Sequence, residues 1–234
     1  MNPAKHPVES LRFIGTLLVA TLCCLGVAMY LRVQTNTNMY RFITWDMFLA
    51  WVPFILSSLI LYVFSRTKTK TGFIAIGLMC AGWLFFLPNS AYLFTEILHS
   101  FRYFDAQAGG KFWVNIDFWY NLTLTFAIAV LGLLLSTCSI TQIHRMINRF
   151  LHRWIGMLVV GTILILTSLG VYIGRFNRWN SWDIISRPEQ IVMDMVNDFN
   201  AGNSILVEFA GIIFIVQVFA YVIVSLLTAR PGKA

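Results

Sequence analysis

The segment from Gly174 to Asp183 concentrates side chains that could bind an anion. It reads Gly-Arg-Phe-Asn-Arg-Trp-Asn-Ser-Trp-Asp and follows directly on a long apolar run. Arg175 and Arg178 are three residues apart, so their guanidinium groups could bind one carboxylate or phosphate together. Asn180 would add a polar contact beside them. The segment therefore predicts an anion-binding site, with Asp183 as a candidate catalytic acid or base.

The same segment also permits a purely structural interpretation. Its short polar side chains are of the kind that close turns and cap helices. Arg175 and Arg178 could then pair with Asp117 and Glu208, and the segment would be a hydrogen-bonded lid without chemistry of its own. The sequence leaves both interpretations open.

Glu96 and His99 form a second group that could do chemistry. They are three residues apart and would share a face of a continuing helix. Glu-x-x-His is the spacing of carboxylate-rich metal sites in helical bundles, so the pair could hold a divalent metal with further ligands from Asp46, Asp117 or Asp183. An ion-paired cluster at the membrane rim fits the same pattern, and so does acid/base use without a metal.

Three further polar residues lie inside or at the ends of apolar segments. Asn89 follows Pro88, which removes a backbone donor and is expected to kink the helix, so Asn89 could line a cavity or serve packing only. Asp117 and Glu208 are costly at their positions unless they face water or the bundle interior. We therefore expect all three near the site, with an arginine of the polar segment as counter-ion.

The elements that must position these residues are membrane-spanning helices. The 234 residues are 58% hydrophobic and 12% charged, with a mean hydropathy of +0.73. Several apolar stretches approach or exceed the ~18–20 residues that a helix needs to cross ~30 Å of hydrocarbon, where lipid offers no partner for backbone groups. The predicted spans are 13–31, 47–64, 73–92, 118–137, 155–172 and 205–228. The sequence therefore predicts one all-α membrane bundle over residues 1–234, with the lipid bilayer as its surroundings.

A short amphipathic helix is expected in the loop between the fifth and sixth spans. Residues 186–189 have the capping-box spacing, with a proline in the first turn. Apolar side chains then recur at helical spacing opposite Asp194, Asn197 and Asp198. The pattern predicts about three turns ending near Gly202, and the acidic face favours packing on protein over attraction to lipid.

The net charge of +7 is explained by basic loops beside anionic lipid headgroups. With a cytoplasmic N-terminus, the inner segments hold ten Lys and Arg and the outer segments seven, and every acid except Glu9 lies on the outer side. The stretch 137–153 would then be a basic cytoplasmic connection. We expect both termini in the cytoplasm. Nucleic acid is not an expected partner, because membrane-adjacent loops account for the basic residues.

Three blocks of the chain resemble a known family. They are Trp-Asp-Met-Phe-Leu-Ala-Trp-Val-Pro at 45–53, Leu-Pro-Asn…Tyr…Thr-Glu…His at 87–99, and the polar segment at 174–183. Together they look like the bacterial membrane family catalogued as domain of unknown function 1361. This chain departs from it with Ser90-Ala91 in place of Ala-Pro and Glu96 in place of Asp. The resemblance implies a bacterial plasma-membrane protein and supplies no reaction.

Three classes of function remain open from the sequence. The first is binding or chemistry on an anionic envelope or lipid-linked substrate at an outward-facing pocket. There, Arg175, Arg178, Asn180, Asn89, Asp46 and Glu208 would bind, and Glu96, His99, Asp183 and Asp117 would act as acid, base or metal ligand. The second is a small transporter, and the third is an accessory membrane subunit without chemistry. Whether the protein is an enzyme, and which protein it contacts, does not follow from the sequence.

Overall fold

Six long apolar helices dominate the computed structural model, which describes residues 10–35, 40–67, 69–101, 111–179, 182–200 and 204–228. They are α1 (Leu11–Thr35), α2 (Arg41–Arg66), α3 (Lys70–Tyr92), α4 (Ile116–Ile147), α5 (Arg153–Tyr172) and α8 (Ser204–Thr228). Each of the six predicted spans falls within one of these helices or its direct continuation, and the described ranges contain no strand. The predicted all-α membrane bundle is therefore confirmed, and the chain is a multi-pass membrane protein.

Shorter helical pieces connect or extend the long helices at one end of the bundle. α3 continues as the 3-10 helix η2 (Leu93–Phe101), and α5 continues as the π-helix η4 (Ile173–Asn177). The remaining pieces are η3 (Phe112–Val114), α6 (Asp183–Ser186) and α7 (Pro188–Asn200). At one end of the bundle α2 begins and both α3 and α5 terminate. We call this part of the molecule the site end.

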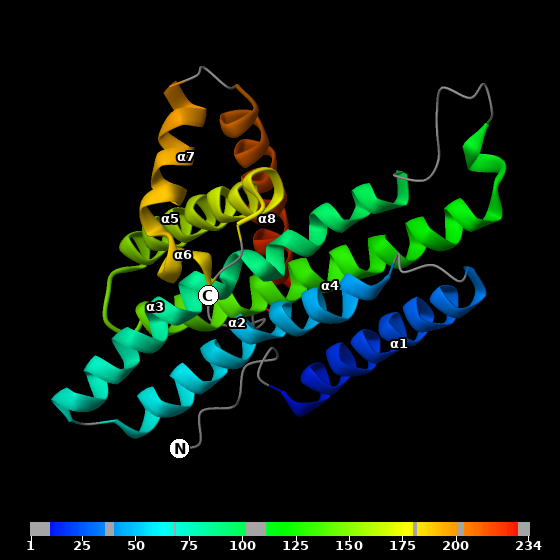
Figure 1. Ribbon diagram of the computed structural model, residues 1–234. Helices are drawn as coiled ribbons and strands as arrows, with labels where there is room; N and C mark the ends of the chain where they lie inside the picture. Colours follow the sequence, from blue (N-terminus) through cyan, green and yellow to red (C-terminus); the bar gives the residue numbers. More distant parts are fainter. Residues whose placement is uncertain are drawn as a thin grey trace.

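The helix α4 is the centre of the bundle. It contacts α1, α2, α3, α5, α8 and η2, and two thirds of its most apolar window are buried. In Figure 1, α1, α2, α3 and α4 run side by side, and α5 and α8 cross them. Long apolar side chains such as Ile128 and Leu135 fill the interior around α4. This central helix therefore sets the positions of the others.

Beyond the predicted fourth span, polar side chains of α4 form a network with α2 and α3. The stretch 137–153 was expected to be a basic connection, but α4 continues to Ile147, so that prediction is wrong for most of the stretch. Gln142 is 1% exposed and accepts a hydrogen bond of 2.5 Å from Ser57 on α2. Trp83 on α3 donates to Ser139 at 2.6 Å. Buried polar side chains that find partners on neighbouring helices can stay inside the bundle.

Close backbone contacts hold α3 between α4 and α5. A Cβ atom added at Gly132 on α4 would lie 2.4 Å from the carbonyl oxygen of Ser90 on α3. A Cβ atom added at Gly170 on α5 would lie 2.4 Å from Cγ of Pro88 on the same α3. Pro88 therefore lies inside α3 at the point where α5 packs most closely.

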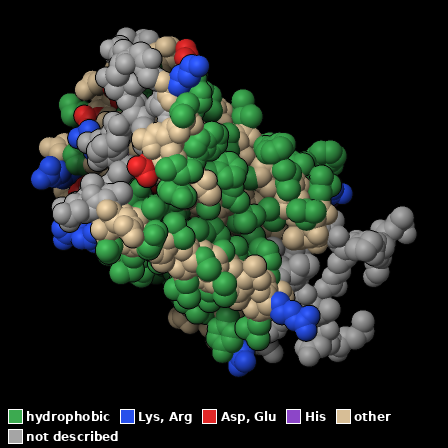
Figure 2. Space-filling view, turned by 90° about the vertical axis from the view of Figure 1, so that its right-hand side faces the viewer, with side chains coloured by type: hydrophobic (Ala, Val, Ile, Leu, Met, Phe, Trp, Pro, Cys, Tyr) green, Lys and Arg blue, Asp and Glu red, His purple; other side chains and the backbone are tan. Residues whose placement is uncertain are grey.

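The outer surface of the bundle is mostly apolar. Figure 2 shows hydrophobic side chains over the middle of one face, with the charged side chains mainly toward the edges of the molecule. Exposed apolar residues occur on the long helices, for example Leu78 on α3 (72%) and Leu158 on α5 (73%). Such a surface is suited to hydrocarbon, because an apolar patch of this extent is rare on proteins that face water.

The predicted amphipathic helix is α7, which packs on η4 and α8. Its acidic side turns toward the protein: Asp194 accepts a hydrogen bond from Trp179, and Asp198 accepts hydrogen bonds from Tyr172 and Asn177. Val192 and Phe199 are exposed, whereas Ile191 is buried. The hydrogen bonds to its carboxylates thus explain why α7 does not bury its whole apolar face.

Candidate functional site

Three separate parts of the chain meet in a cavity at the site end. They are the first turns of α2, the end of α3 with η2, and the polar segment after α5. The cavity has a volume of about 800 Å³. We call it the polar pocket; its lining residues are Trp45, Asp46, Leu49, Asn89, Tyr92, Leu98, His99, Gly174, Arg175, Arg178, Trp179 and Trp182.

His99 lines this pocket, and Glu96 lies directly beside His99. His99 Nδ1 is 3.0 Å from Glu96 Oε2, and the carboxylate is only 1% exposed. A 3-10 helix has three residues per turn, so residues three apart lie directly above one another, as the spacing of this pair requires. The predicted shared face is therefore present, although the helix that creates it is η2 and not a continued α-helix.

The distance between His99 Nδ1 and Glu96 Oε2 is that of an ion pair. The two atoms are not oriented as in a hydrogen bond. Within the described ranges, Glu96 Oε2 and His99 Nδ1 have no hydrogen-bond partner. The ring of His99 contacts the ring of Phe42 at a tilt of 34°, with ring centroids 4.6 Å apart. A small rotation of the imidazole would complete a hydrogen bond to the carboxylate. The imidazole of His99 thus contacts both the Glu96 carboxylate and the Phe42 ring.

Arg175 connects this pair to the polar segment. Its Nη1 lies 4.0 Å from Glu96 Oε1, and its guanidinium lies near the hydroxyl of Tyr92. Only about a fifth of the Arg175 side chain is exposed. Sequence reasoning expected Asp117 or Glu208 as the counter-ion, but the structure places Glu96 in that position.

The backbone after α5 determines where the two arginines point. The helix widens into the π-helix η4 at Ile173, a form that often occurs at functional sites. Arg178 then has a φ of 58°, and it is the one described residue other than glycine with positive φ. The backbone N–H groups of Arg178 and Trp179 both donate to the carbonyl of Ile173, which stabilises this sharp turn. As a result Arg175 and Arg178 line the same pocket.

Asp46 and Asn89 were predicted as binding residues, and both line the polar pocket. Asp46 lies in the first turns of α2, within electrostatic range of Glu96 and His99. Asn89 donates a hydrogen bond to the carbonyl of Phe86 at 3.0 Å, which orients its amide. The lining of the pocket therefore combines one carboxylate, one imidazole and two guanidinium groups, with the carboxylate of Glu96 buried beside His99.

Other predicted site residues lie elsewhere. Asp117 is exposed in the first turn of α4, and Glu208 is exposed on α8; neither lines the polar pocket. Asp183 begins α6 and is partly buried, but it is also absent from the pocket lining. Asn180 falls outside the described residues.

Aromatic residues that sequence reasoning did not assign to the site form much of its wall. Tyr92 and Trp179 line the pocket, and Trp45 meets Trp182 edge-on with ring centroids 6.4 Å apart. The spacing of Asn89 and Tyr92 on one helix was a signal that could have identified Tyr92. Nothing in the sequence brings Trp45 next to Trp182, because this contact joins α2 to a segment more than a hundred residues away.

The suggested metal site receives limited geometric support. Within the described part of the chain, no three His, Cys, Asp or Glu side chains are close enough together to hold a metal ion. Glu96 and His99 would supply two ligands at most from this set.

Comparison with known proteins connects the chain to one family. A family model described as "Protein of unknown function (DUF1361)" matches residues 45–219, about three quarters of the chain. The match includes α2 from Trp45 onward, all of η2 and the whole polar segment, so every residue that lines the polar pocket lies within it. No curated protein and no solved structure matches the chain.

Proposed function

Because the chain belongs to the family described as "Protein of unknown function (DUF1361)", which names no reaction, we propose its function from the geometry of the polar pocket. The protein binds the anionic group of an envelope or lipid-linked molecule there. His99 and Glu96 then exchange protons with the bound molecule. The pocket opens to the outside of a bacterial plasma membrane, and both termini lie in the cytoplasm.

The observation that carries this proposal is the pair of arginines in one cavity. Arg175 lies beside Glu96 and near Tyr92, so its guanidinium has defined neighbours before a ligand arrives. Arg178 is exposed and, in the described residues, makes no ion pair. An arginine without a carboxylate partner, next to an arginine in a defined position, is suited to bind a phosphate or carboxylate group.

The proposed proton exchange depends on the order of the groups from the pocket inward. His99 lines the cavity, whereas Glu96 lies behind it and is almost fully buried. In this order the carboxylate can orient the imidazole and stabilise its charged form, while the imidazole meets the ligand. Asp46 lines the same cavity from α2 and is a second acid or base there.

The test is anion binding by the protein in phosphatidylcholine nanodiscs, measured by calorimetry with inorganic phosphate as the probe. Arg178→Gln should weaken binding by about tenfold, the low end of what a charge-assisted hydrogen bond contributes. Arg187→Gln is the matched control, because Arg187 is exposed near the same end and does not line the pocket. Equal binding by both variants, or no binding by the wild-type protein, would contradict the proposal.

The accessory role is a second candidate that one observation favours. Glu96 approaches both His99 and Arg175, so these charges could serve only to hold η2 against the polar segment. In that case Arg175→Gln would destabilise the protein, and no phosphate binding would be measured for any variant. The sequence also left open a role as a small transporter. Phosphate uptake into proteoliposomes is the measurement that tests this role.

The orientation of the protein in the membrane can be tested separately. Trp182 is exposed beside the polar pocket. A single cysteine at this position, in a chain whose native cysteines are replaced by serine, should react with a membrane-impermeant maleimide in intact cells. Labelling only after cell lysis would place the pocket on the cytoplasmic side.

A further inference from the structure

An apolar cavity of about 460 Å³ adjoins the polar pocket. We call it the apolar groove. It shares four lining residues with the polar pocket: Asn89, Tyr92, Gly174 and Trp179. The two cavities are therefore neighbours that meet at these side chains, one polar and one apolar.

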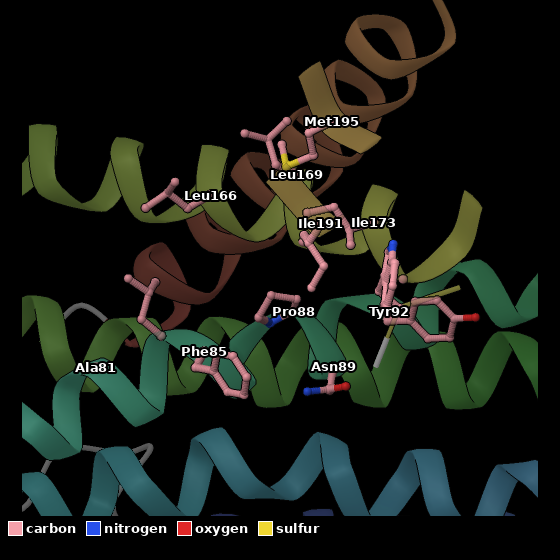
Figure 3. A pocket seen from close by; sticks show the side chains of 14 residues that line it. Ala81, Phe85, Pro88, Asn89, Tyr92, Leu166, Leu169, Ile173, Ile191 and Met195 are labelled. Carbon is pink, nitrogen blue, oxygen red and sulfur yellow. The ribbon is translucent and has the colours of Figure 1, made fainter. Parts of the chain in front are cut away.

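The apolar groove is built from matching faces of two helices. α3 contributes Ala81, Leu84, Phe85, Pro88, Asn89 and Tyr92, which recur at helical spacing along one face. α5 with its extension contributes Leu166, Leu169, Gly170, Ile173 and Gly174 at the same spacing. The contact of Gly170 with Pro88 brings the two helices together and closes the floor between them. Figure 3 shows Leu169 of α5 and Ile173 of η4 above Pro88 of α3, with Ile191 reaching into the space between the two helices and Met195 above it.

The length and direction of the groove suit a hydrocarbon chain. From Tyr92, at the polar pocket, it follows α3 for eleven residues to Ala81, which is about 16 Å at 1.5 Å per residue. This is roughly half of the ~30 Å hydrocarbon core of a bilayer. Ala81 and Leu166, at the far end of the groove, are both exposed.

The geometry points to an amphiphile as the ligand, with one anionic head group in the polar pocket and one hydrocarbon tail in the apolar groove. This inference rests on the proposed function and adds the class of its ligand. Arg178 and Arg175 bind the head, and the tail lies between α3 and α5 under Met195. Trp179 stands at the boundary, where its indole N–H is bound to Asp194 at 2.9 Å and its ring lines both cavities.

The two cavities must act together for the ligand to be selected. A tail gains little by leaving lipid for an equally apolar groove, so the groove alone would not distinguish one lipid from another. The polar pocket alone would bind any small anion. A molecule that joins both fills the two cavities in one event, and the entropy of placing its second part is largely avoided.

Photo-crosslinking of the full chain in phosphatidylcholine nanodiscs tests the inference. The probe is dodecyl phosphate with a diazirine at the end of its tail, and adducts are located by mass spectrometry after digestion. We expect adducts at groove residues such as Ala81 and Leu166, about tenfold above those at Leu78 and Leu158. The last two are exposed on the same helices and line neither cavity.

Competition and variants separate the head from the tail. Excess dodecyl phosphate should remove the groove adducts, and excess dodecyl glucoside, which has the same tail and no charge, should not. Arg178→Gln should reduce them about tenfold. Leu166→Trp fills the groove and should abolish them, with Ala81→Trp as a second such variant. Leu158→Trp is the matched control and should leave them unchanged.

Three results would overturn the inference. Adducts spread evenly over lipid-facing residues would show that the groove has no preference for the tail. Groove adducts that dodecyl glucoside removes, or that Arg178→Gln leaves intact, would show that ordinary bilayer lipid fills it. If inorganic phosphate still binds in an Arg178-dependent way in these cases, the proposed function stands and only the amphiphile is wrong; if phosphate does not bind, the proposed function fails as well.

Discussion

Replacing Glu96 with glutamine tests whether a buried charge holds the site together. Glu96 is 1% exposed and approaches two groups, His99 at 3.0 Å and Arg175 at 4.0 Å. Glutamine has nearly the same shape, so Glu96→Gln removes the charge and little of the packing. The change therefore isolates the electrostatic contribution of the carboxylate to the position of Arg175.

The size of the effect follows from the distance and the burial. Two unit charges 4.0 Å apart interact by about 4 kcal/mol at an effective dielectric constant of ~20. Burying the carboxylate costs part of this, and glutamine avoids that cost. Arg175 also keeps its position near Tyr92 and borders the polar pocket. We therefore expect Glu96→Gln to lower the free energy of unfolding by about 2 kcal/mol, less than the ~3–5 kcal/mol for a fully buried pair.

The assay is reversible unfolding in mixed micelles, followed by circular dichroism, with a double-mutant cycle. The double variant Glu96→Gln/Arg175→Met should be about 2 kcal/mol more stable than expected from adding the losses in free energy of unfolding of the two single variants. The reason is that the two side chains interact directly. Glu189→Gln is the control: Glu189 is exposed in the first turn of α7, and its loss should stay within about 0.5 kcal/mol. A cycle whose single losses add, or a Glu96→Gln loss no larger than that of the control, would refute the reasoning.

Three further predictions concern the parts of the fold that build the site. Gly170→Ala should lower the free energy of unfolding by about 1–3 kcal/mol in the same assay, because its Cβ would lie 2.4 Å from Pro88, whereas Gly161→Ala, with nothing within 4 Å, should cost nothing. Equal effects of the two changes would contradict the close packing of α3 on α5. Gln217→Leu removes the hydrogen bond of 2.9 Å to Ser168 and should cost only about 0.6 kcal/mol, the average for such bonds between membrane helices; a loss above ~2 kcal/mol would mean that more than this bond is at stake. Trp179→Phe removes the hydrogen bond to Asp194, so amide hydrogen exchange in α7 should become about tenfold faster, and an unchanged rate would show that this bond does not hold the helix.

The pattern of apolar residues was sufficient to predict the helices, because a chain in lipid must satisfy its backbone groups within each span. Every predicted span lies inside an observed helix or its continuation. The prediction was too short for α4, since Ser139 and Gln142 look like loop residues in a hydropathy pattern. Their partners Trp83 and Ser57 lie on other helices, so only the packed bundle shows why they are buried.

Local spacing was sufficient to predict which side chains within one segment lie close together. Glu96 and His99 are close because they are three residues apart in a helical element, and Arg175 and Arg178 share a pocket across one turn of chain. The membership in the family also follows from the sequence. None of these contacts requires knowledge of how the helices pack.

The tertiary structure decided which segments share the site. Asp46 and Asn89 join Arg175 in the polar pocket, whereas Asp117 and Glu208 lie outside it although their residue types and apolar settings looked equally suitable. The apolar groove exists only because Gly170 lets α5 approach Pro88 on α3. Helical periodicity defines the faces of each helix, but the rotation of each helix about its axis depends on the packing of all its neighbours, and a single sequence does not contain that information in local form.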